Sequence, residues 1–314
     1  MRIVPDGQMV FGMQLPIQAQ SSMFVADWER DAGPDELVAI TRAAEEAGFF
    51  YVAACDHVSV PERLAPAMGT TWYDPISTLA LLAGVTDRIR LMSHVWVLAY
   101  RHPLLSAKAF ATLDHLSKGR VIIGVGAGHV AEEFATLGLA FEQRGKLLDE
   151  AIDALKVALT DEFPTFSGPT WSFSGGGARP RPTQQPRPPI WIGGSSPAAV
   201  RRAGERGDGW LPQGTPKREM PAEIAKLREH RERVGGDPVE IGAIHLPFLY
   251  VGAPPSDIGE GVSSGSPERI AGSLRDFKEM GVDHLQIRFK VRSCDELLDQ
   301  IAAFATDVAP LVNS

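Results

Sequence analysis

The chain has 314 residues, of which 44% are apolar and 22% are charged, and its formal net charge is −8. This length and composition are typical of a globular protein with a large core. The acidic balance argues against a nucleic-acid partner or an anionic membrane, because both require clustered Lys and Arg. The two cysteines, Cys55 and Cys294, form no CxxC pair. We therefore expect no metal centre and a reducing compartment.

The first residues, up to Gln14, lack the charged-then-apolar order of a signal peptide. No stretch approaches the ~20 apolar residues that span a bilayer. The sequence therefore predicts a cytoplasmic protein. Its 31 glycines and 24 prolines exceed average usage without a fixed period, which indicates many tight loops between regular elements.

Strand-like and helix-like runs alternate along nearly the whole chain. The expected strands are 10–15, 49–55, 89–97, 120–125, 189–192, 209–211, 241–251 and 284–289. Several of the intervening helices begin with proline and end before glycine, as Pro34 and Gly48 do around the first one. Eight strands alternating with helices predict an α/β protein with one (β/α)8, TIM-like barrel domain spanning 1–314. A doubly wound open sheet is the alternative.

Residues 161–190 interrupt this alternation. The segment holds seven prolines and four glycines around the aromatic residues Phe163, Phe166, Trp171 and Phe173. A long loop with its own aromatic residues inside a compact domain is usually functional. We expect an insertion with a short hairpin that forms a lid or wall of the site.

Active sites of such barrels lie at the carboxyl ends of the strands. Three histidines fall at or near expected strand ends, namely His57, His94 and His129. Imidazole titrates near neutral pH, so it suits proton transfer in a shielded pocket. Simpler roles remain open: capping for His57 and His129, and a core position for His94.

Two glycine clusters also lie at strand ends. The run Gly193, Gly194 and Ser195 leads from a strand into a helix that begins with proline, so its free N–H groups suit a phosphate. An ordinary tight turn is the alternative. The cluster from Gly124 to Gly128 reads GxGxG and not GxGxxG, and the chain has no Walker loop and no HExxH pair.

Three long stretches carry a resemblance to a known family. They are RHPLLSAKAFATLDHLSKGRVIIGVGAG (101–128), FEQRGKLLDE (141–150) and PTQQPRPPIWIGG (182–194). Together they resemble the luciferase-like monooxygenase superfamily, and in particular its branch that uses the deazaflavin coenzyme F420. The resemblance implies a TIM-like barrel with a flavin or deazaflavin lying across the strand ends.

The resemblance also implies roles for individual residues. A non-proline cis peptide within Ser93, His94 and Val95 would support the cofactor ring, and the Gly193–Gly194 turn would bind its phosphate. Asp56 and His57 resemble the Asp-His pair of deazaflavin sugar-phosphate dehydrogenases, in which the histidine is the base for a substrate hydroxyl.

Two positions depart from the family patterns. Those dehydrogenases carry glutamate where this chain has His129, so we do not expect oxidation of glucose 6-phosphate. Bacterial luciferases carry arginine where this chain has Ala127, so we do not expect light emission.

We therefore predict an oxidoreductase that transfers a hydride between coenzyme F420 and a small organic substrate. The expected acid or base is His57, oriented by Asp56, with His129 as the second candidate. The expected cofactor-binding residues are Ser93, His94, Val95, Gly126, Gly128, His129, Gly193, Gly194 and Ser195. The expected substrate-binding residues are Gln14, Trp72, Tyr73, Trp96 and Arg288, with the insertion as a further wall.

Two alternatives keep the same fold. One is a monooxygenase that uses reduced FMN and oxygen, and the other is a flavin-binding barrel without catalysis. The family often forms dimers, so a homodimer is the expected assembly.

Overall fold

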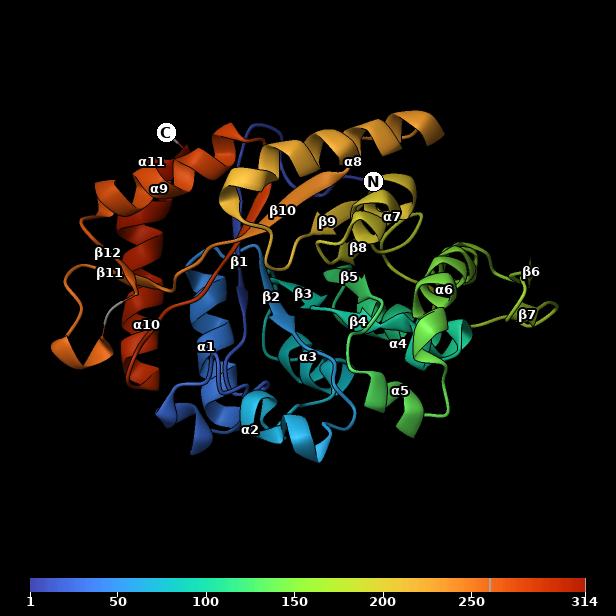
Figure 1. Cartoon of the computed structure of the whole chain (residues 1–314), viewed down its shortest axis with the longest axis horizontal. Coiled ribbons are helices and arrows are strands. Elements are labelled where there is room, and N and C mark those ends of the chain that lie inside the picture. Colours follow the sequence, from blue (N-terminus) through green and yellow to red (C-terminus); the bar gives the residue numbers. More distant parts are fainter. Residues whose placement is uncertain (260, 314) are drawn as a thin grey trace.

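A computed structural model describes residues 1–259 and 261–313 and shows a closed barrel of eight parallel strands (Figure 1). The order around the barrel is β1, β2, β3, β5, β8, β9, β10 and β13, and β13 pairs with β1. The strands are β1 (Val10–Gln14), β2 (Tyr51–Ala54), β3 (Arg90–Ser93), β5 (Val121–Gly126), β8 (Ile190–Gly193), β9 (Gly209–Leu211), β10 (Glu240–Ile244) and β13 (His284–Ile287). The predicted barrel is confirmed.

Helices cover the outside of the barrel. The longer ones are α1 (Pro34–Glu46), α3 (Pro75–Ala83), α4 (Pro103–Leu116), α6 (Arg144–Thr160), α7 (Pro197–Arg206), α8 (Met220–Val234), α9 (Pro267–Glu279) and α10 (Cys294–Ala303). The chain continues from α10 through a π-helical turn, Phe304–Val308, into α11 (Ala309–Asn313). No helix in the described ranges is long and apolar enough to cross a membrane.

The strands are buried on both faces, which explains their nearly continuous apolar sequences. All six residues of β5 are buried. Large side chains, including Tyr51, Met92 and Trp191, fill the inside of the barrel. Helices such as α1, which buries Leu37 and Ile40, seal the outside.

The expected strand 89–97 is interrupted by a bulge. It divides into β3 and β4 (Trp96–Val97), and both segments pair with β5. Met92 is opposite Ile122 and Trp96 is opposite Val125, so four steps on one strand face three on the other. The peptide bond between His94 and Val95 within this bulge is cis, as expected from the resemblance.

The expected strand 241–251 also divides in two. Its second part, β11 (Leu249–Val251), leaves the barrel and pairs with β12 (Ser263–Gly265). A cis bond between Leu246 and Pro247 lies between β10 and β11.

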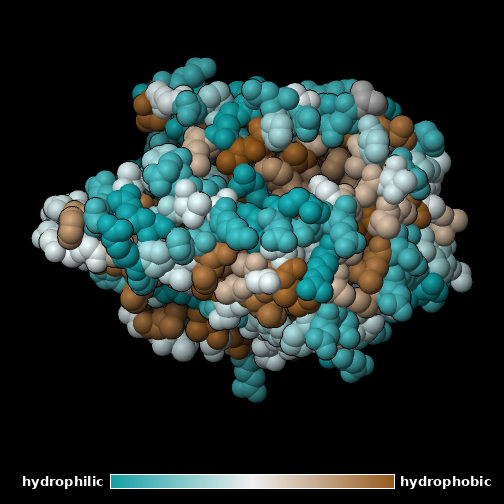
Figure 2. Space-filling view, turned by 180° about the vertical axis from the view of Figure 1, so that it is seen from behind, coloured by the Kyte–Doolittle hydropathy of each residue, from teal (hydrophilic) through white to brown (hydrophobic). Residues whose placement is uncertain are grey.

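The insertion 161–190 does form a hairpin, of β6 (Phe166–Ser167) and β7 (Ser172–Phe173). The hairpin projects from the flank of α6, at the right of Figure 1 and at the left of the reverse view in Figure 2. Trp171 of this hairpin packs against the buried cluster of Val97, Phe134 and Leu147, and the role of the insertion as a wall of the site stays a prediction. The insertion connects a helix to the next strand, and such connections begin and end on the face opposite the active-site loops. Accordingly, the Gln184 side chain donates to the carbonyl of Val121, the first residue of β5.

The loops at the carboxyl ends of the strands gather along the lower edge of Figure 1. They include the segment between β1 and α1, the short helix α2 (Ala65–Met68) after β2, and α5 (Ala131–Thr136) after β5. The candidate site lies among these loops.

Candidate active site at the mouth of the barrel

His57 lies in the loop after β2, and its ring is held by a carboxylate from another loop. Its Nδ1 is 2.8 Å from Oε2 of Glu133, a residue of α5. The Glu133 side chain is only 1% exposed and also accepts from the backbone N–H groups of Val58 (2.8 Å) and Ser59 (3.1 Å). Tyr100 donates its hydroxyl to the same carboxylate at 3.3 Å. Glu133 therefore fixes both His57 and the loop that carries it.

The charge of Glu133 determines what His57 can do. Burial by itself would raise the pKa of this carboxyl, but the hydrogen bonds from His57 and the backbone hold the pKa below its usual range. An ionised Glu133 favours a proton on Nδ1 of His57, which leaves Nε2 as the nitrogen with a free lone pair. No described residue makes a hydrogen bond to that nitrogen.

Two further predicted residues surround the His57 ring. Trp72 lies with its ring centroid 4.3 Å away, and His129 lies at 5.4 Å in an edge-on arrangement. Partial burial and the nearby His57 lower the pKa of His129. A second imidazole kept neutral beside His57 remains available for hydrogen bonding.

Asp56 does not orient His57, which corrects the prediction. Its carboxylate forms a two-pronged ion pair with Arg101, at 2.7 and 2.9 Å, and accepts from the Val97 backbone N–H at 2.8 Å. The Arg101 guanidinium in turn lies 3.5 Å from the centre of the Trp96 ring. Asp56 therefore ties the end of β2 to β4, while the residue after it carries the imidazole.

Trp96 is not a wall of a substrate pocket, which is a second correction. Its side chain is 4% exposed, donates from Nε1 to the Ser106 hydroxyl at 3.1 Å, and meets Phe110 edge-on. Both partners belong to α4. Trp96 thus packs between the barrel and a helix. The side chain of Tyr73 packs against the main core as well.

Three of the glycines at the strand ends lie so close to the bulge that a side chain at their positions would collide with it. A Cβ on Gly193 would lie 2.5 Å from Val95, and one on Gly126 would meet the other methyl of the same side chain. A Cβ on Gly124 would collide with the Ser93 carbonyl oxygen. Gly128 has a φ of +78° and turns the chain toward α5. These glycines therefore shape the surface on which a cofactor would lie.

The Gly193–Ser195 turn is tied to the strand beside it. The Gly194 N–H donates to the Leu211 carbonyl at 3.0 Å, and the Ser195 hydroxyl donates to the Gln213 carbonyl at 2.7 Å. Ser196 caps α7 through its side chain. These bonds hold the backbone of the turn in place. Phosphate binding at the turn stays a prediction.

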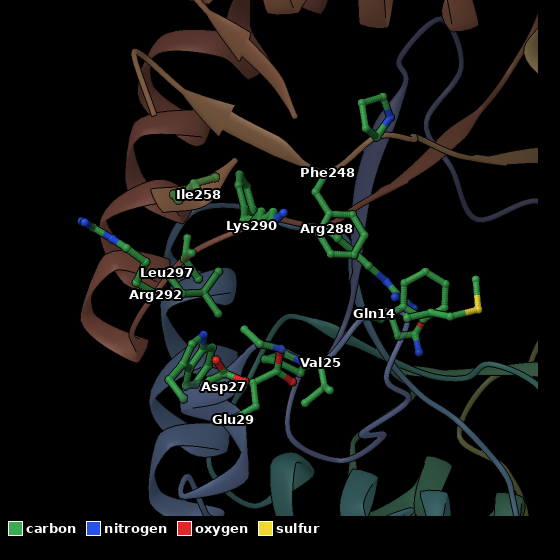
Figure 3. Close-up of a pocket in the computed structure, with 18 of the residues that line it drawn as sticks. Gln14, Val25, Asp27, Glu29, Phe248, Ile258, Arg288, Lys290, Arg292 and Leu297 are labelled. Atoms are coloured by element: carbon green, nitrogen blue, oxygen red, sulfur yellow. The ribbon is translucent and has the colours of Figure 1, made fainter. Parts of the chain in front are cut away.

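Gln14 and Arg288 come together in a cavity of about 730 Å³ at the ends of β1 and β13. In Figure 3 the Arg288 side chain passes Phe248 and extends toward Gln14. The Gln14 amide contacts the Cys55 sulfur at 2.7 Å. Burial raises the pKa of Cys55 to about 11, so the thiol is neutral at physiological pH. The volume is in the range of small-molecule sites.

Buried polar atoms without hydrogen-bond partners also lie on the barrel strands and at the bulge. In the described ranges, both ring nitrogens of His94 and both amide atoms of Gln286 make no hydrogen bond. Burial lowers the pKa of His94 to about 3, so its ring is neutral. Buried polar groups are almost always paired in folded proteins. His94 and Gln286 therefore fit the polar edge of a heteroaromatic ring such as a flavin or deazaflavin.

Comparison with known proteins identifies the family. Residues 9–262 match the family model described as luciferase-like monooxygenase. The chain belongs to this family. Among curated relatives, an F420-dependent hydroxymycolic acid dehydrogenase of Mycobacterium tuberculosis is 33% identical over 229 residues, which are 69% of this chain and 59% of that protein.

Solved structures show the same luciferase-like fold. An F420-dependent secondary alcohol dehydrogenase in complex with an F420–acetone adduct has a TM-score of 0.78 at 18% identity, over 97% of this chain and 99% of that chain. The oxygenating constituent of 3,6-diketocamphane monooxygenase of Pseudomonas putida, a type II Baeyer–Villiger enzyme bound to FMN, has a TM-score of 0.77 at 15% identity, over 97% and 98%. The luciferase-like barrel therefore houses both kinds of cofactor.

Glu133 was not predicted as a site residue from the sequence. It lies 76 positions from His57, and only the arrangement of α5 over the barrel mouth brings the two together. A usable signal was present: two carboxylates, Glu132 and Glu133, shortly after the glycine turn.

Proposed function

We propose that this luciferase-like protein is an oxidoreductase that uses coenzyme F420 and acts on a small organic substrate. The curated relative named as an F420-dependent dehydrogenase supports this choice of cofactor. The observation that carries the proposal is the His57–Glu133 pair, a proton-transfer group oriented by a buried carboxylate at the barrel mouth.

The residues that would hold the cofactor come from three places. The bulge at Ser93, His94 and Val95 offers a surface cleared by Gly126 and Gly193. His94 and Gln286 supply neutral hydrogen-bonding groups, and the Gly193–Ser195 turn is the candidate for the phosphate. When bound, a deazaflavin gives or accepts a hydride, so the protein has only to position both reactants and move a proton.

His57 performs the proton transfer in this account. Glu133 keeps the proton on Nδ1, so Nε2 accepts the proton of a substrate hydroxyl during oxidation and returns it during reduction. The imidazolium that forms is stabilised by the carboxylate at 2.8 Å. The Trp72 ring at 4.3 Å limits the rotation of the imidazole and shields it from water.

The experiment is turnover with F420 and alcohols, and with reduced F420 and aldehydes, imines and enones, measured by the absorbance of the oxidised deazaflavin. With any accepted substrate, His57→Ala should lower kcat by about a hundredfold or more, while the Kd for F420 stays unchanged. His129→Ala should have a smaller effect on kcat. Undiminished turnover in His57→Ala would remove this residue from the acid–base role.

A monooxygenase that uses reduced FMN is the second candidate. It is favoured by the likeness in fold to the FMN-bound Baeyer–Villiger enzyme, at 15% identity. A comparison of F420 and FMN affinities separates the two candidates.

A further inference from the structure

The cavity at the ends of β1 and β13 holds a guanidinium, that of Arg288, with which no described side chain makes a hydrogen bond or a direct ion pair. Its lining includes three cationic residues, Arg288, Lys290 and Arg292, and three acidic ones, Asp27, Glu29 and Asp257. Arg292 pairs with Glu296 and with Asp257. Asp27 lies 3.7 Å from Arg30. In the described ranges, the Arg288 guanidinium forms no ion pair or hydrogen bond with another side chain or the backbone.

Glu29, the remaining carboxylate of the cavity, is satisfied by the backbone instead. It accepts from the N–H groups of Ile17 at 2.8 Å and Ala26 at 2.9 Å, and so fastens the loop after β1. Glu29 belongs to the short helical turn Asp27–Arg30, and its bond from the Ala26 N–H caps the start of that turn. Its side chain is buried. Glu29 therefore has a structural task and does not neutralise Arg288 by direct contact.

Arg288 is nevertheless held in one orientation. Its guanidinium lies 4.2 Å from the centre of the Phe24 ring and 5.9 Å from that of Phe248, and these two rings stack at 6.1 Å. Stacking on aromatic faces leaves the N–H groups at the edge of the guanidinium free. Figure 3 shows the Arg288 side chain extending toward Gln14, which also lines the cavity. A planar, preorganised set of donors matches a carboxylate.

The rim of the same cavity is apolar and exposed. Met23 is 76% exposed and Leu246 is 57% exposed, and both line the cavity together with the partly exposed Phe24. Large apolar side chains in contact with water at the mouth of a pocket mark a surface that a ligand covers. The cavity thus offers a cation within and apolar side chains at its entrance.

We propose that this cavity binds the substrate as an amphipathic carboxylic acid, with the carboxylate on Arg288 and the apolar chain over Met23, Phe24 and Leu246. This proposal rests on the proposed function, because it assigns a substrate class to the same barrel mouth: Ala19 lines the cavity and pairs through its backbone with Trp72, whose ring packs on His57. Arg288 is a specificity-determining residue here, and His57 remains the acid or base.

The test is calorimetric titration of the full chain, with and without saturating F420, using decanoate, decanol, decyl phosphate and acetate as probes. Decanoate should bind most tightly, because decanol lacks the anion and acetate lacks the chain. Arg288→Met should weaken decanoate by about tenfold or more and leave decanol unchanged. Arg288→Lys should fall between, since it keeps the charge and loses the fork. Arg218→Met, which removes an exposed arginine outside the cavity, is the matched control.

Three results would overturn the proposal. They are wild-type protein that does not prefer decanoate to decanol, tighter binding of decyl phosphate, and equal decanoate affinity in the wild type and both Arg288 variants. Loss of F420 affinity in the Arg288 variants, with decanoate affinity retained, would assign Arg288 to the cofactor instead. Decanoate binding that depends on Arg288, in a protein that fails to bind F420, would leave this proposal standing and remove the proposed function.

Discussion

At the scale of single residues, the site depends on which carboxylate meets His57. The sequence places Asp56 beside the histidine, but neighbours along a strand end point in different directions, and Asp56 turns to Arg101. Glu133 approaches from α5 and could not be paired with His57 from spacing alone. The sequence therefore singled out His57 as the candidate acid or base, whereas the carboxylate that contacts it required the arrangement of the loops.

Glu133→Gln tests this pairing. The amide keeps the shape but loses the negative charge, so the imidazolium that forms on His57 during proton transfer is less stabilised. We expect turnover to drop by about tenfold or more and the acidic limb of the pH–rate profile for oxidation to move to lower pH. Glu132→Gln, the adjacent residue of α5 that pairs with Arg63, is the control and should leave both unchanged. An unmoved limb in Glu133→Gln would contradict the assignment.

Asp56→Asn should behave differently. It breaks a buried ion pair with Arg101, so the free energy of unfolding in urea should decrease by about 3 kcal/mol. The position of the acidic limb should stay where it is in the wild type, because Asp56 does not contact His57. A shift of the limb equal to that of Glu133→Gln would restore Asp56 to the orienting role.

At the scale of elements, the alternation of strands and helices was predictable, because eight short apolar runs separated by helix-like segments are typical of a barrel. The interruptions were harder to predict from pattern, since Ser93 and His94 break the apolar run only briefly and are buried like their neighbours. Only the family resemblance pointed to the bulge. The hairpin within the insertion was predicted from composition. Where the insertion begins and ends was not, because this follows from its connecting the end of α6 to the start of β8.

Gly193→Ala tests how the glycines support the bulge. The new Cβ would lie 2.5 Å from Val95, so we expect a loss of about 1–3 kcal/mol in the free energy of unfolding and weaker F420 binding. Adding Val95→Ala should recover part of the stability, giving a non-additive double-mutant cycle. Gly176→Ala in the insertion after β7, where a Cβ meets nothing within 4 Å, is the control. Strictly additive effects would show that Gly193 and Val95 do not constrain each other.

At the scale of the whole molecule, three buried histidines connect stability to pH. Burial lowers the pKa of His94 and His284 to about 3 and that of His245 to about 4. Below pH 6.5 these histidines bind protons in the unfolded chain but not in the folded chain. Their contribution to the free energy of unfolding is therefore lost as the pH falls from 6.5 toward 4. Each histidine contributes a slope of at most about 1.4 kcal/mol per pH unit.

Urea unfolding of the cofactor-free protein at a series of pH values measures this slope. His245→Gln should make the slope shallower, because it removes one of the three groups at a position that packs against Phe277 of α9. His115→Gln is a suitable control at a histidine of the surface helix α4. The same slope in His245→Gln and in the wild type would contradict the burial of this ring as a neutral group.

We propose that the barrel binds a deazaflavin at the bulge and that His57 transfers the proton. The most direct measurement is the affinity of the purified protein for F420 and for FMN, followed by fluorescence quenching. We expect micromolar binding of F420, at least tenfold weaker binding of FMN, and loss of F420 affinity in Gly193→Ala but not in His57→Ala. Micromolar binding of FMN without binding of F420 would contradict the proposal.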